Sequence, residues 1–357
     1  MHYERDNIWR MAGYEPGEQP TDHQTIKLTT NENPYPPPDA VMQALTEIQA
    51  EDLRRYPTPS AARFRAAAAQ YHGVTPEQIV TTNGGDELIR LALTTFVTPG
   101  QPIGIADPSY SLYLTAATIH NSPVIKAPLG DDWNLPEDFA QQMNQAGVGL
   151  SLIVNPHAPS GLLLDSATID AIAGRLNGVL LVDEAYVDFA DPKHDLVPLV
   201  KKHHNLLILR TLSKGYSLAG LRLGYGIGAE RLIHPIAYKT RDSFSVDVIA
   251  DHLGATALAH RNAYSVGWEM VRENRNKLIA ALRERGFTVP PSQSNFCLAT
   301  VPVSGKPARQ LYLALKKAGV LVRYFNTSRL KNQLRITVGT AEQNARLLEA
   351  IDAANRE

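Results

Sequence analysis

A lysine between two apolar segments is the most reactive group that the sequence offers. Lys214 follows the apolar run 206–209 and a short polar turn with Thr211 and Ser213, and Arg222 comes eight residues after the lysine. Burial disfavours the charged form of a lysine, and the neutral amine is a nucleophile suited to Schiff-base chemistry. The alternative is a loop lysine whose amino group reaches solvent. This stretch alone leaves both interpretations open.

Further polar residues follow other predicted strands, and ligands of open α/β sheets bind at the carboxyl ends of strands. Asp183 ends an apolar strand and Tyr186 comes shortly after it. A buried carboxylate needs a cation or several donors, unless Asp183 only caps a loop or helix. The turn 83–86, Asn-Gly-Gly-Asp, precedes a predicted helix whose N-terminus offers N–H groups to an anion. Taken alone, such a Gly-Gly turn is more often only a tight turn.

Together these groups match the needs of pyridoxal 5'-phosphate. Lys214 would form the Schiff base, and Asp183 would pair with the protonated ring nitrogen and keep the ring an electron sink. Tyr186 would donate a hydrogen bond to the ring hydroxylate. The residues expected to bind the cofactor phosphate are Gly85, Asp86, Thr211, Ser213 and Arg222.

The residues 183–186 (DEAY) and 211–214 (TLSK) with Arg222 resemble the fold type I aminotransferases. The resemblance narrows to the histidinol-phosphate aminotransferase family through motifs that follow the family's order over nearly the whole chain. These motifs are TTNENPYPPP (29–38), RYP (55–57), NGGDE (83–87), PSYSLY (108–113), VDEAYVDF (182–189), RTLSKGYSLAGLRLGY (210–225), SNF (294–296), VLVRYF (320–325) and LRITVGT (334–340). The resemblance implies transamination of L-histidinol phosphate with 2-oxoglutarate, a step of histidine biosynthesis that gives imidazole-acetol phosphate and glutamate.

The resemblance also implies roles for single residues. Lys214 is implied to be the Schiff-base lysine and the proton shuttle, and Tyr110 covers the ring face by stacking. Tyr56 resembles a tyrosine that reaches the cofactor phosphate of a neighbouring subunit, which implies a homodimer with a shared active site. The groups that resemble the receivers of the substrate's phosphate or carboxylate are Tyr35, Arg323 and Arg335. For the two arginines the alternative is a surface salt bridge.

One loop departs from the family's pattern. The family usually has Asn-Pro-Thr-Gly where this chain has Ala-Pro-Ser-Gly at 158–161. Ala158 cannot donate the usual hydrogen bond to the ring hydroxyl, so either Asn155 replaces it or Tyr186 serves alone. Loss of this bond would shift the pKa of the Schiff base. His157 in the same loop either touches substrate or is an ordinary exposed histidine.

Regular alternation of strands and helices from residue 60 predicts an α/β fold. We expect a large domain with a mostly parallel sheet covered by helices, and a smaller α+β domain. The predicted strands of the large domain are 79–82, 103–106, 124–127, 150–155, 179–183, 206–209 and 223–227. Ser60 is expected to cap a helix that Gly73 ends, and a long helix from Tyr264 to Arg285 should link the domains. The expected boundaries are 1–40 for an N-terminal arm with part of the small domain, 41–261 for the large cofactor-binding domain and 262–357 for the small C-terminal domain.

Composition excludes several other classes of function. The formal net charge of -1 provides no global basic field for nucleic acid or an anionic membrane. Cys297 is the only cysteine, so an intrachain disulfide is impossible and a reducing compartment fits. The N-terminus lacks the apolar core of a signal peptide, and no apolar run approaches the ~18 residues of a membrane span. We therefore predict a cytoplasmic protein with small-molecule substrates and, without a cysteine cluster or HExxH pattern, no metal.

Three other functions remain open at this point. An aromatic amino-acid aminotransferase or a threonine-phosphate decarboxylase would use the same scaffold with another substrate. A regulatory or binding protein of the pyridoxal fold would need fewer of the catalytic residues. The presence of Lys214, Asp183 and the arginines argues against this last function, although Ala158 keeps it open.

Overall fold

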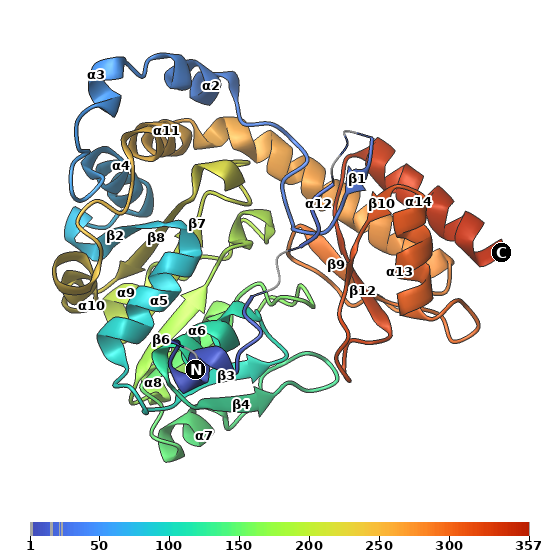
Figure 1. The fold of residues 1–357 in the computed structure, drawn as a ribbon, viewed down its shortest axis with the longest axis horizontal. Coiled ribbons are helices and arrows are strands. Elements are labelled where there is room, and N and C mark those ends of the chain that lie inside the picture. Colours follow the sequence, from blue (N-terminus) through green and yellow to red (C-terminus); the bar gives the residue numbers. More distant parts are fainter. Residues whose placement is uncertain (1–2, 15–16, 21, 23, 357) are drawn as a thin grey trace.

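A seven-stranded sheet forms the centre of the larger part of the computed structural model, which describes residues 3–14, 17–20, 22 and 24–356 (Figure 1). The strand order is β2-β8-β7-β6-β5-β3-β4, and β8 alone runs antiparallel to its neighbours. The strands are β2 (Ile79–Asn83), β3 (Ile103–Asp107), β4 (Val124–Pro128), β5 (Leu150–Val154), β6 (Val179–Asp183), β7 (Leu206–Thr211) and β8 (Leu223–Gly228).

Helices cover both faces of this sheet, which explains why its central strands are apolar without interruption. Along β7, Leu206 and Ile208 pack into one core, whereas Leu207 and Leu209 pack into the core on the opposite face. The helices of this part are α4 (Ala62–His72), α5 (Gly84–Phe96), α6 (Leu112–His120), α7 (Phe139–Gln145), α8 (Ser166–Arg175), α9 (Leu199–Lys202), α10 (Glu230–Pro235), a π-helical turn (Ile236–Thr240) and α11 (Val248–Ala259).

The ends of α4 show where local sequence reasoning succeeds and where it fails. Gly73 ends the helix with a φ of 62°, as predicted. The expected cap by Ser60 is wrong: Thr58 Oγ1 accepts the hydrogen bond from the Ala62 amide at 3.0 Å. The chain enters the helix through Ala61 with a φ of 47°, so the capping hydroxyl comes from further upstream than the predicted position.

The smaller part holds a three-stranded antiparallel sheet, ordered β11 (Arg323–Tyr324), β12 (Gln333–Thr337) and β9 (Phe296–Thr300). The helices α13 (Ala308–Lys317) and α14 (Ala341–Arg356) pack on it, and the long helix α12 (Arg261–Glu284) runs between the two parts (Figure 1). The motif at 320–325 forms two strands. Its first half, β10 (Val320–Leu321), pairs with β1 (Ile26–Lys27) of the N-terminal arm, and its second half pairs with β12.

The remaining N-terminal helices are short. They are α1 (Asp6–Trp9), α2 (Asp39–Thr46) and α3 (Ala50–Leu53). The arm between α1 and α2 crosses from the large sheet to the small part, where β1 lies, before it returns to α2 (Figure 1). The arm therefore lies between the two parts, beside the carboxyl ends of the large sheet's strands.

Candidate active site

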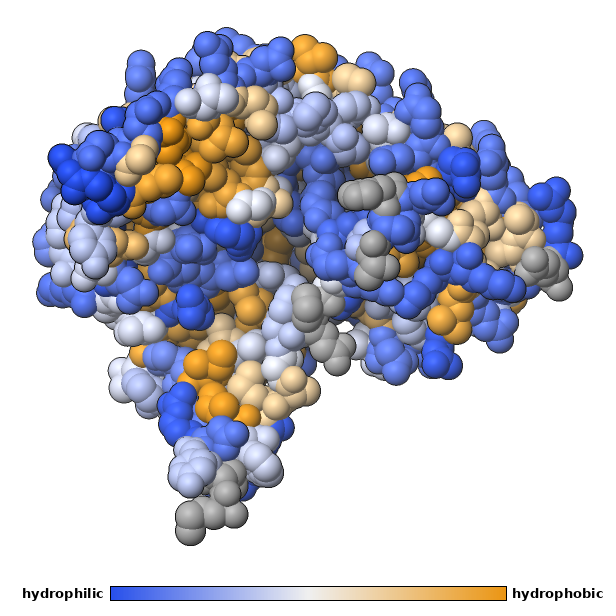
Figure 2. Space-filling view, turned by 45° about the horizontal axis from the view of Figure 1, so that its top comes forward, coloured by the Kyte–Doolittle hydropathy of each residue, from blue (hydrophilic) through white to orange (hydrophobic). Residues whose placement is uncertain are grey.

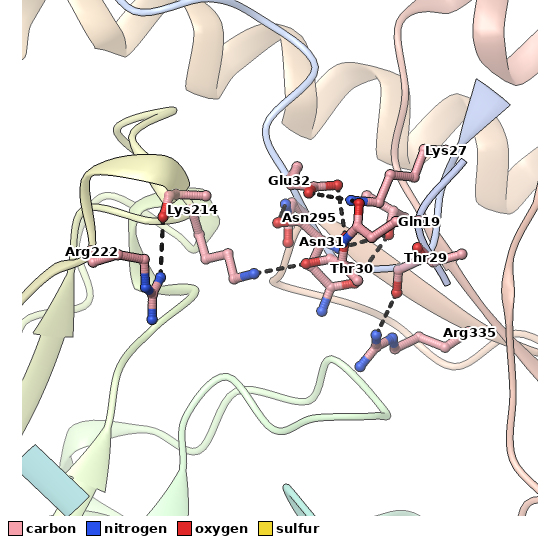
Figure 3. Close-up of polar contacts among 12 residues, drawn as sticks. Gln19, Lys27, Thr29, Thr30, Asn31, Glu32, Lys214, Arg222, Asn295 and Arg335 are labelled. Carbon is pink, nitrogen blue, oxygen red and sulfur yellow. Dashed lines mark hydrogen bonds and ion pairs between the residues drawn. The ribbon is translucent and has the colours of Figure 1, made fainter. Parts of the chain in front are cut away.

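Lys214 projects from the turn after β7 toward the N-terminal arm (Figure 3). Its Nζ donates a hydrogen bond to the carbonyl oxygen of Thr30 at 2.7 Å. Burial, assisted by the positive charge of Arg335, lowers the pKa of Lys214 to about 8. The structure thus favours the nucleophilic amine over a loop lysine that extends into solvent.

Arg222 and the start of α5 frame an anion site beside this lysine. Arg222 adopts a left-handed φ of 54°, and its Nη1 lies 3.4 Å from Ser213 Oγ. Its Nη2 lies 3.9 Å from a carboxylate oxygen of Asp86 in the first turn of α5. A Cβ at Gly84 would come within 2.6 Å of this guanidinium, so glycine permits the approach. The arginine therefore faces the amino end of a helix that attracts anions.

The other expected phosphate ligands lie at the same place. The Ser213 amide donates to Thr211 Oγ1 at 3.1 Å, and the two hydroxyl oxygens are 3.0 Å apart. Gly85 lies in the first turn of α5, where main-chain N–H groups have no partner within the helix. The structure therefore gathers two hydroxyls, a guanidinium and a helix N-terminus around one small volume.

Asp183 ends β6 and is only 5% exposed. Its Oδ2 accepts from the Tyr113 hydroxyl at 2.9 Å and its Oδ1 accepts from the Ala185 amide at 3.1 Å. Burial raises the pKa of this carboxyl to about 6, although both hydrogen bonds lower it. A cation next to Asp183 would supply the charge that these two donors do not.

Two tyrosines border the space between Lys214 and Asp183. Tyr110 packs edge-to-face on Tyr113, with ring centroids 5.6 Å apart. Tyr186 accepts a hydrogen bond from Asn31 Nδ2 at 3.1 Å, so its own phenolic proton stays available to a further acceptor. This supports the expectation that Tyr186 can serve as the hydroxylate donor.

Arg323 and Arg335 are directly opposite each other on β11 and β12. Arg335 Nη2 donates to the Thr29 carbonyl at 2.7 Å, but its buried Nε has no partner in the described part of the chain. Burial, together with the charge of Arg323, lowers the pKa of Arg335. Neither arginine forms a salt bridge within the described residues, so the surface ion pair weighed as the alternative is not formed. An unpaired buried guanidinium N–H suits an anionic ligand.

Asn155 is engaged by the loop that follows it. Its side-chain oxygen accepts from the Leu164 amide at 2.8 Å, and its side-chain nitrogen donates to the Leu164 carbonyl at 3.0 Å. Asn155 is completely buried. Both ends of the amide therefore fix the 155–164 loop, and of its donors only the second N–H of Nδ2 is left for the role of the asparagine missing at Ala158.

Within the described residues, the side-chain contacts of Tyr35 and Tyr56 are with groups other than Lys214 and the two arginines. The Tyr35 hydroxyl accepts from Asn274 Nδ2 on α12 at 3.0 Å, so this contact is with α12 and not with the two arginines. Tyr56 is 82% exposed and stacks on Phe244 with ring centroids 4.6 Å apart. A tyrosine so placed on the surface is available to another molecule.

Sequence reasoning missed several residues of this site. Tyr113, Asn31 and Asn295 lie inside motifs that carry the family resemblance, yet their contacts with Asp183, with Tyr186 and with the Asn31 carbonyl are visible only in three dimensions. Tyr14 lies in none of the motifs that predict the site. Its ring centroid lies 6.3 Å from that of Tyr110.

The segment around α1 brings Tyr14 to this position. Arg5 Nη2 and Asn7 Nδ2 donate to main-chain carbonyls of α6, at 2.8 and 2.6 Å. These two contacts hold α1 and the residue before it against α6. Tyr14 is therefore a candidate contact for whatever binds beside Tyr110.

Across the described ranges, no three or more histidine, cysteine or acidic side chains gather where they could hold a metal ion. None of the helices described combines the length and apolar character that crossing a membrane requires.

Comparisons with known proteins agree with the fold and identify the family. The family model for aminotransferase class I and II matches residues 23–351, and the chain belongs to this family. A histidinol-phosphate aminotransferase from Microcystis aeruginosa is 40% identical over 347 residues, covering 97% of each chain. One from Crocosphaera subtropica is 39% identical over 353 residues, covering 99% of each chain. The resemblance inferred from the motifs is thereby confirmed.

The fold is shared with a solved structure of a histidinol-phosphate aminotransferase from Sinorhizobium meliloti in complex with pyridoxal-5'-phosphate. The TM-score is 0.86 at 23% identity, over 93% of this chain and 91% of that one. The predicted combination of a large, mostly parallel α/β sheet with a smaller α+β part is confirmed.

Proposed function

We propose that this aminotransferase transfers an amino group between L-histidinol phosphate and 2-oxoglutarate, giving imidazole-acetol phosphate and glutamate, with pyridoxal 5'-phosphate as cofactor. Relatives of nearly full length carry the name of this activity. The observation that carries the proposal is the position of Lys214. Its amine, with a lowered pKa, lies between an anion cup at Arg222 and the guanidinium of Arg335, whose buried Nε has no partner among the described residues.

The residues present fit the cofactor. Asp183 is a buried carboxyl that forms no ion pair within the described residues, and burial raises its pKa. The buried Oδ1 of Asn295, next to the arm that Lys214 touches, also has no partner among the described residues. Asp183 would hold the ring nitrogen, and Tyr186 the ring hydroxyl. The phosphate would be held by Gly85, Asp86, Thr211, Ser213 and Arg222. The bound cofactor supplies an electron sink for the carbanion formed at the amino-bearing carbon.

Lys214 then serves as the base and acid of the reaction. A pKa of about 8 leaves about a tenth of the amine neutral at pH 7, so both protonation states are accessible for proton transfer in either direction. The Thr30 carbonyl accepts from Nζ and orients the amine. Tyr110 covers the ring face and keeps water from it.

The arginine pair would bind the anionic ends of both substrates. Two guanidinium groups offer forked donors to the carboxylate of glutamate or the phosphate of histidinol phosphate. Because Arg335 Nε is already buried and unpaired, binding an anion there satisfies a donor that otherwise remains desolvated.

A direct test compares amino donors in the first half-reaction of the holoenzyme. In rapid mixing, histidinol phosphate is expected to change the absorbance spectrum of the bound cofactor at least about tenfold more efficiently than phenylalanine does. Only histidinol phosphate presents a dianion to the arginines. Comparable efficiency with phenylalanine would contradict the proposal in favour of an aromatic aminotransferase. Release of carbon dioxide from threonine phosphate would identify a decarboxylase.

We also propose a homodimer in which Tyr56 completes the partner's site. Figure 2 shows apolar side chains gathered on the surface of the molecule. Met42 and Leu45 of α2 and Leu53 of α3 are exposed apolar side chains. Such patches mark interaction sites on soluble proteins. Tyr56 is highly exposed in the same region of the sequence, so its phenol is free to reach the phosphate cup of a second copy.

Mixed dimers test the shared site. Lys214→Ala and Tyr56→Phe chains, purified and then unfolded and refolded together, are expected to regain activity, since each hybrid contains one site with both native residues. Each variant refolded alone is the control. If the refolded mixture shows no more activity than the sum of the two variants refolded alone, Lys214 and Tyr56 act within one chain.

We propose that the chain divides into a large cofactor-binding domain at 41–261 and a small domain at 262–357, to which the arm at 1–40 contributes. The pairing of β1 with β10 and the separate core of the small part support this division. We also propose that the protein is cytoplasmic, which agrees with its single, buried cysteine Cys297.

A further inference from the structure

The loop that connects β11 and β12 reaches across to the large part of the molecule. Leu330 of this loop and Leu298 of β9 pack with Leu129 and Trp133, which follow β4, and with Ala106 of β3. This cluster is separate from the cores of the two parts. The apolar contact therefore joins the small sheet to β3 and to the loop that follows β4.

Arg329 adds directed contacts to this junction. Its Nη1 and Nη2 donate to the carbonyl oxygens of Leu129 and Gly130 at 2.6 and 2.5 Å. Its guanidinium carbon lies 4.3 Å from the ring centroid of Trp133, in cation–π contact. A flat, forked cation is needed to make both hydrogen bonds and the stacking contact at once, which lysine cannot do.

Trp133 in turn packs on His157, with ring centroids 6.0 Å apart. His157 Nε2 lies 2.9 Å from the Pro108 carbonyl oxygen and Nδ1 lies 2.8 Å from Ser160 Oγ. Because a carbonyl can only accept, Nε2 carries the proton. Burial lowers the pKa of His157 to about 4, so the ring is neutral and Nδ1 accepts from the serine hydroxyl. His157 is thus a fixed structural link, neither exposed nor a substrate contact.

Two sets of contacts from this junction reach the same residues, 107–108, of the large part. Through His157, Trp133 is linked to Pro108, and the Leu129 amide donates to the Asp107 carbonyl at 3.1 Å. Residues 107–108 directly precede the turn that carries Tyr110. At the other end, the loop of Arg329 connects the two short strands that carry the substrate arginines.

We infer that Arg329 and Trp133 form a clamp that sets the position of Arg323 and Arg335 relative to Tyr110. Arg329 and Trp133 are positioning residues for binding of the anionic substrates. The inference rests on the proposed function, because it assigns the arginine pair to substrate. The cofactor itself is held by residues of the large sheet and its loops, so the clamp should control substrate affinity with little influence on cofactor affinity.

The test compares Arg329→Ala, Arg329→Lys and the matched control Lys331→Ala in the holoenzyme. Lys331 is an exposed cation of the same loop. Both Arg329 variants are expected to raise KM for glutamate and for histidinol phosphate about tenfold, with kcat and cofactor affinity changed less than about threefold. Hydrogen exchange of the amides at 129–134 should be faster in both, because that loop loses its two hydrogen bonds. Lys331→Ala should match the wild type in every measurement.

Faster exchange with unchanged KM would overturn the positioning role, and unchanged exchange would overturn the clamp. A KM effect in Arg329→Ala that Arg329→Lys restores would show that charge alone is needed, which also contradicts the geometry. Failure of the proposed function is distinguishable, since wild-type enzyme would then not convert histidinol phosphate. The exchange measurement and the glutamate half-reaction would still test the clamp.

Discussion

Replacement of Lys214 with alanine is expected to lower kcat by at least about a thousandfold, because one residue provides both the nucleophile and the proton carrier. Its amine is held by the Thr30 carbonyl at 2.7 Å, and no other lysine shares this position. Steady-state transamination and the absorbance of the bound cofactor are the measurements. We expect the variant to bind the cofactor with an altered spectrum and nearly no turnover.

The pH dependence of cofactor capture gives an independent check. Burial lowers the pKa of Lys214 to about 8, so the reactive neutral amine increases as pH rises through that value and is nearly complete above pH 9. Capture of pyridoxal phosphate by the apoenzyme should therefore accelerate between pH 6.5 and about 9, and then level off. Lys202→Ala, which removes an exposed lysine paired with Asp170, serves as a control without effect. Full turnover by Lys214→Ala would refute the assignment.

The sequence predicted the large sheet well because its strands are buried on both faces. Continuous apolar runs such as β6 and β7 have one plausible structure once helices alternate with them. Strand ends then locate Asp183, Thr211, Ser213 and Lys214 at one edge of the sheet, which is why chemistry could be inferred from chain order alone. Motif resemblance added the arginines of the small part, which lies far along the chain.

Contacts between distant segments could not be predicted in the same way. Asn155 has the right residue type and lies three positions from Ala158, but its direction depends on the Leu164 main chain. Tyr14 comes from a segment without periodicity, and its place beside Tyr110 depends on two hydrogen bonds of α1 to α6. An exposed loop position remained one alternative for His157, because no residue near it in the sequence indicates that Trp133 packs on it.

Without its carboxylate partner, the cofactor ring should lose much of its capacity as an electron sink, so Asp183→Ala is expected to reduce kcat about a hundred- to a thousandfold. This corresponds to about 2.7–4.1 kcal/mol, close to the roughly 3–5 kcal/mol typical when one member of a buried charge pair is removed. Asp183→Asn keeps the shape and the Ala185 contact but removes the charge, so it should be impaired almost as strongly. Asp183→Glu should retain more activity than either.

Tyr113→Phe separates the charge of Asp183 from its surroundings. The Tyr113 hydroxyl donates to Asp183 Oδ2 at 2.9 Å and lowers the carboxyl pKa against the larger effect of burial. Without this donor the pKa of Asp183 rises, so the carboxylate is protonated at higher pH and the acid limb of the kcat profile should move upward. At pH 8 and above, where the carboxyl is ionised in both proteins, Tyr113→Phe should stay within about tenfold of the wild type. An Asp183→Asn variant with wild-type kcat across this range would show that catalysis does not need the negative charge of this carboxylate.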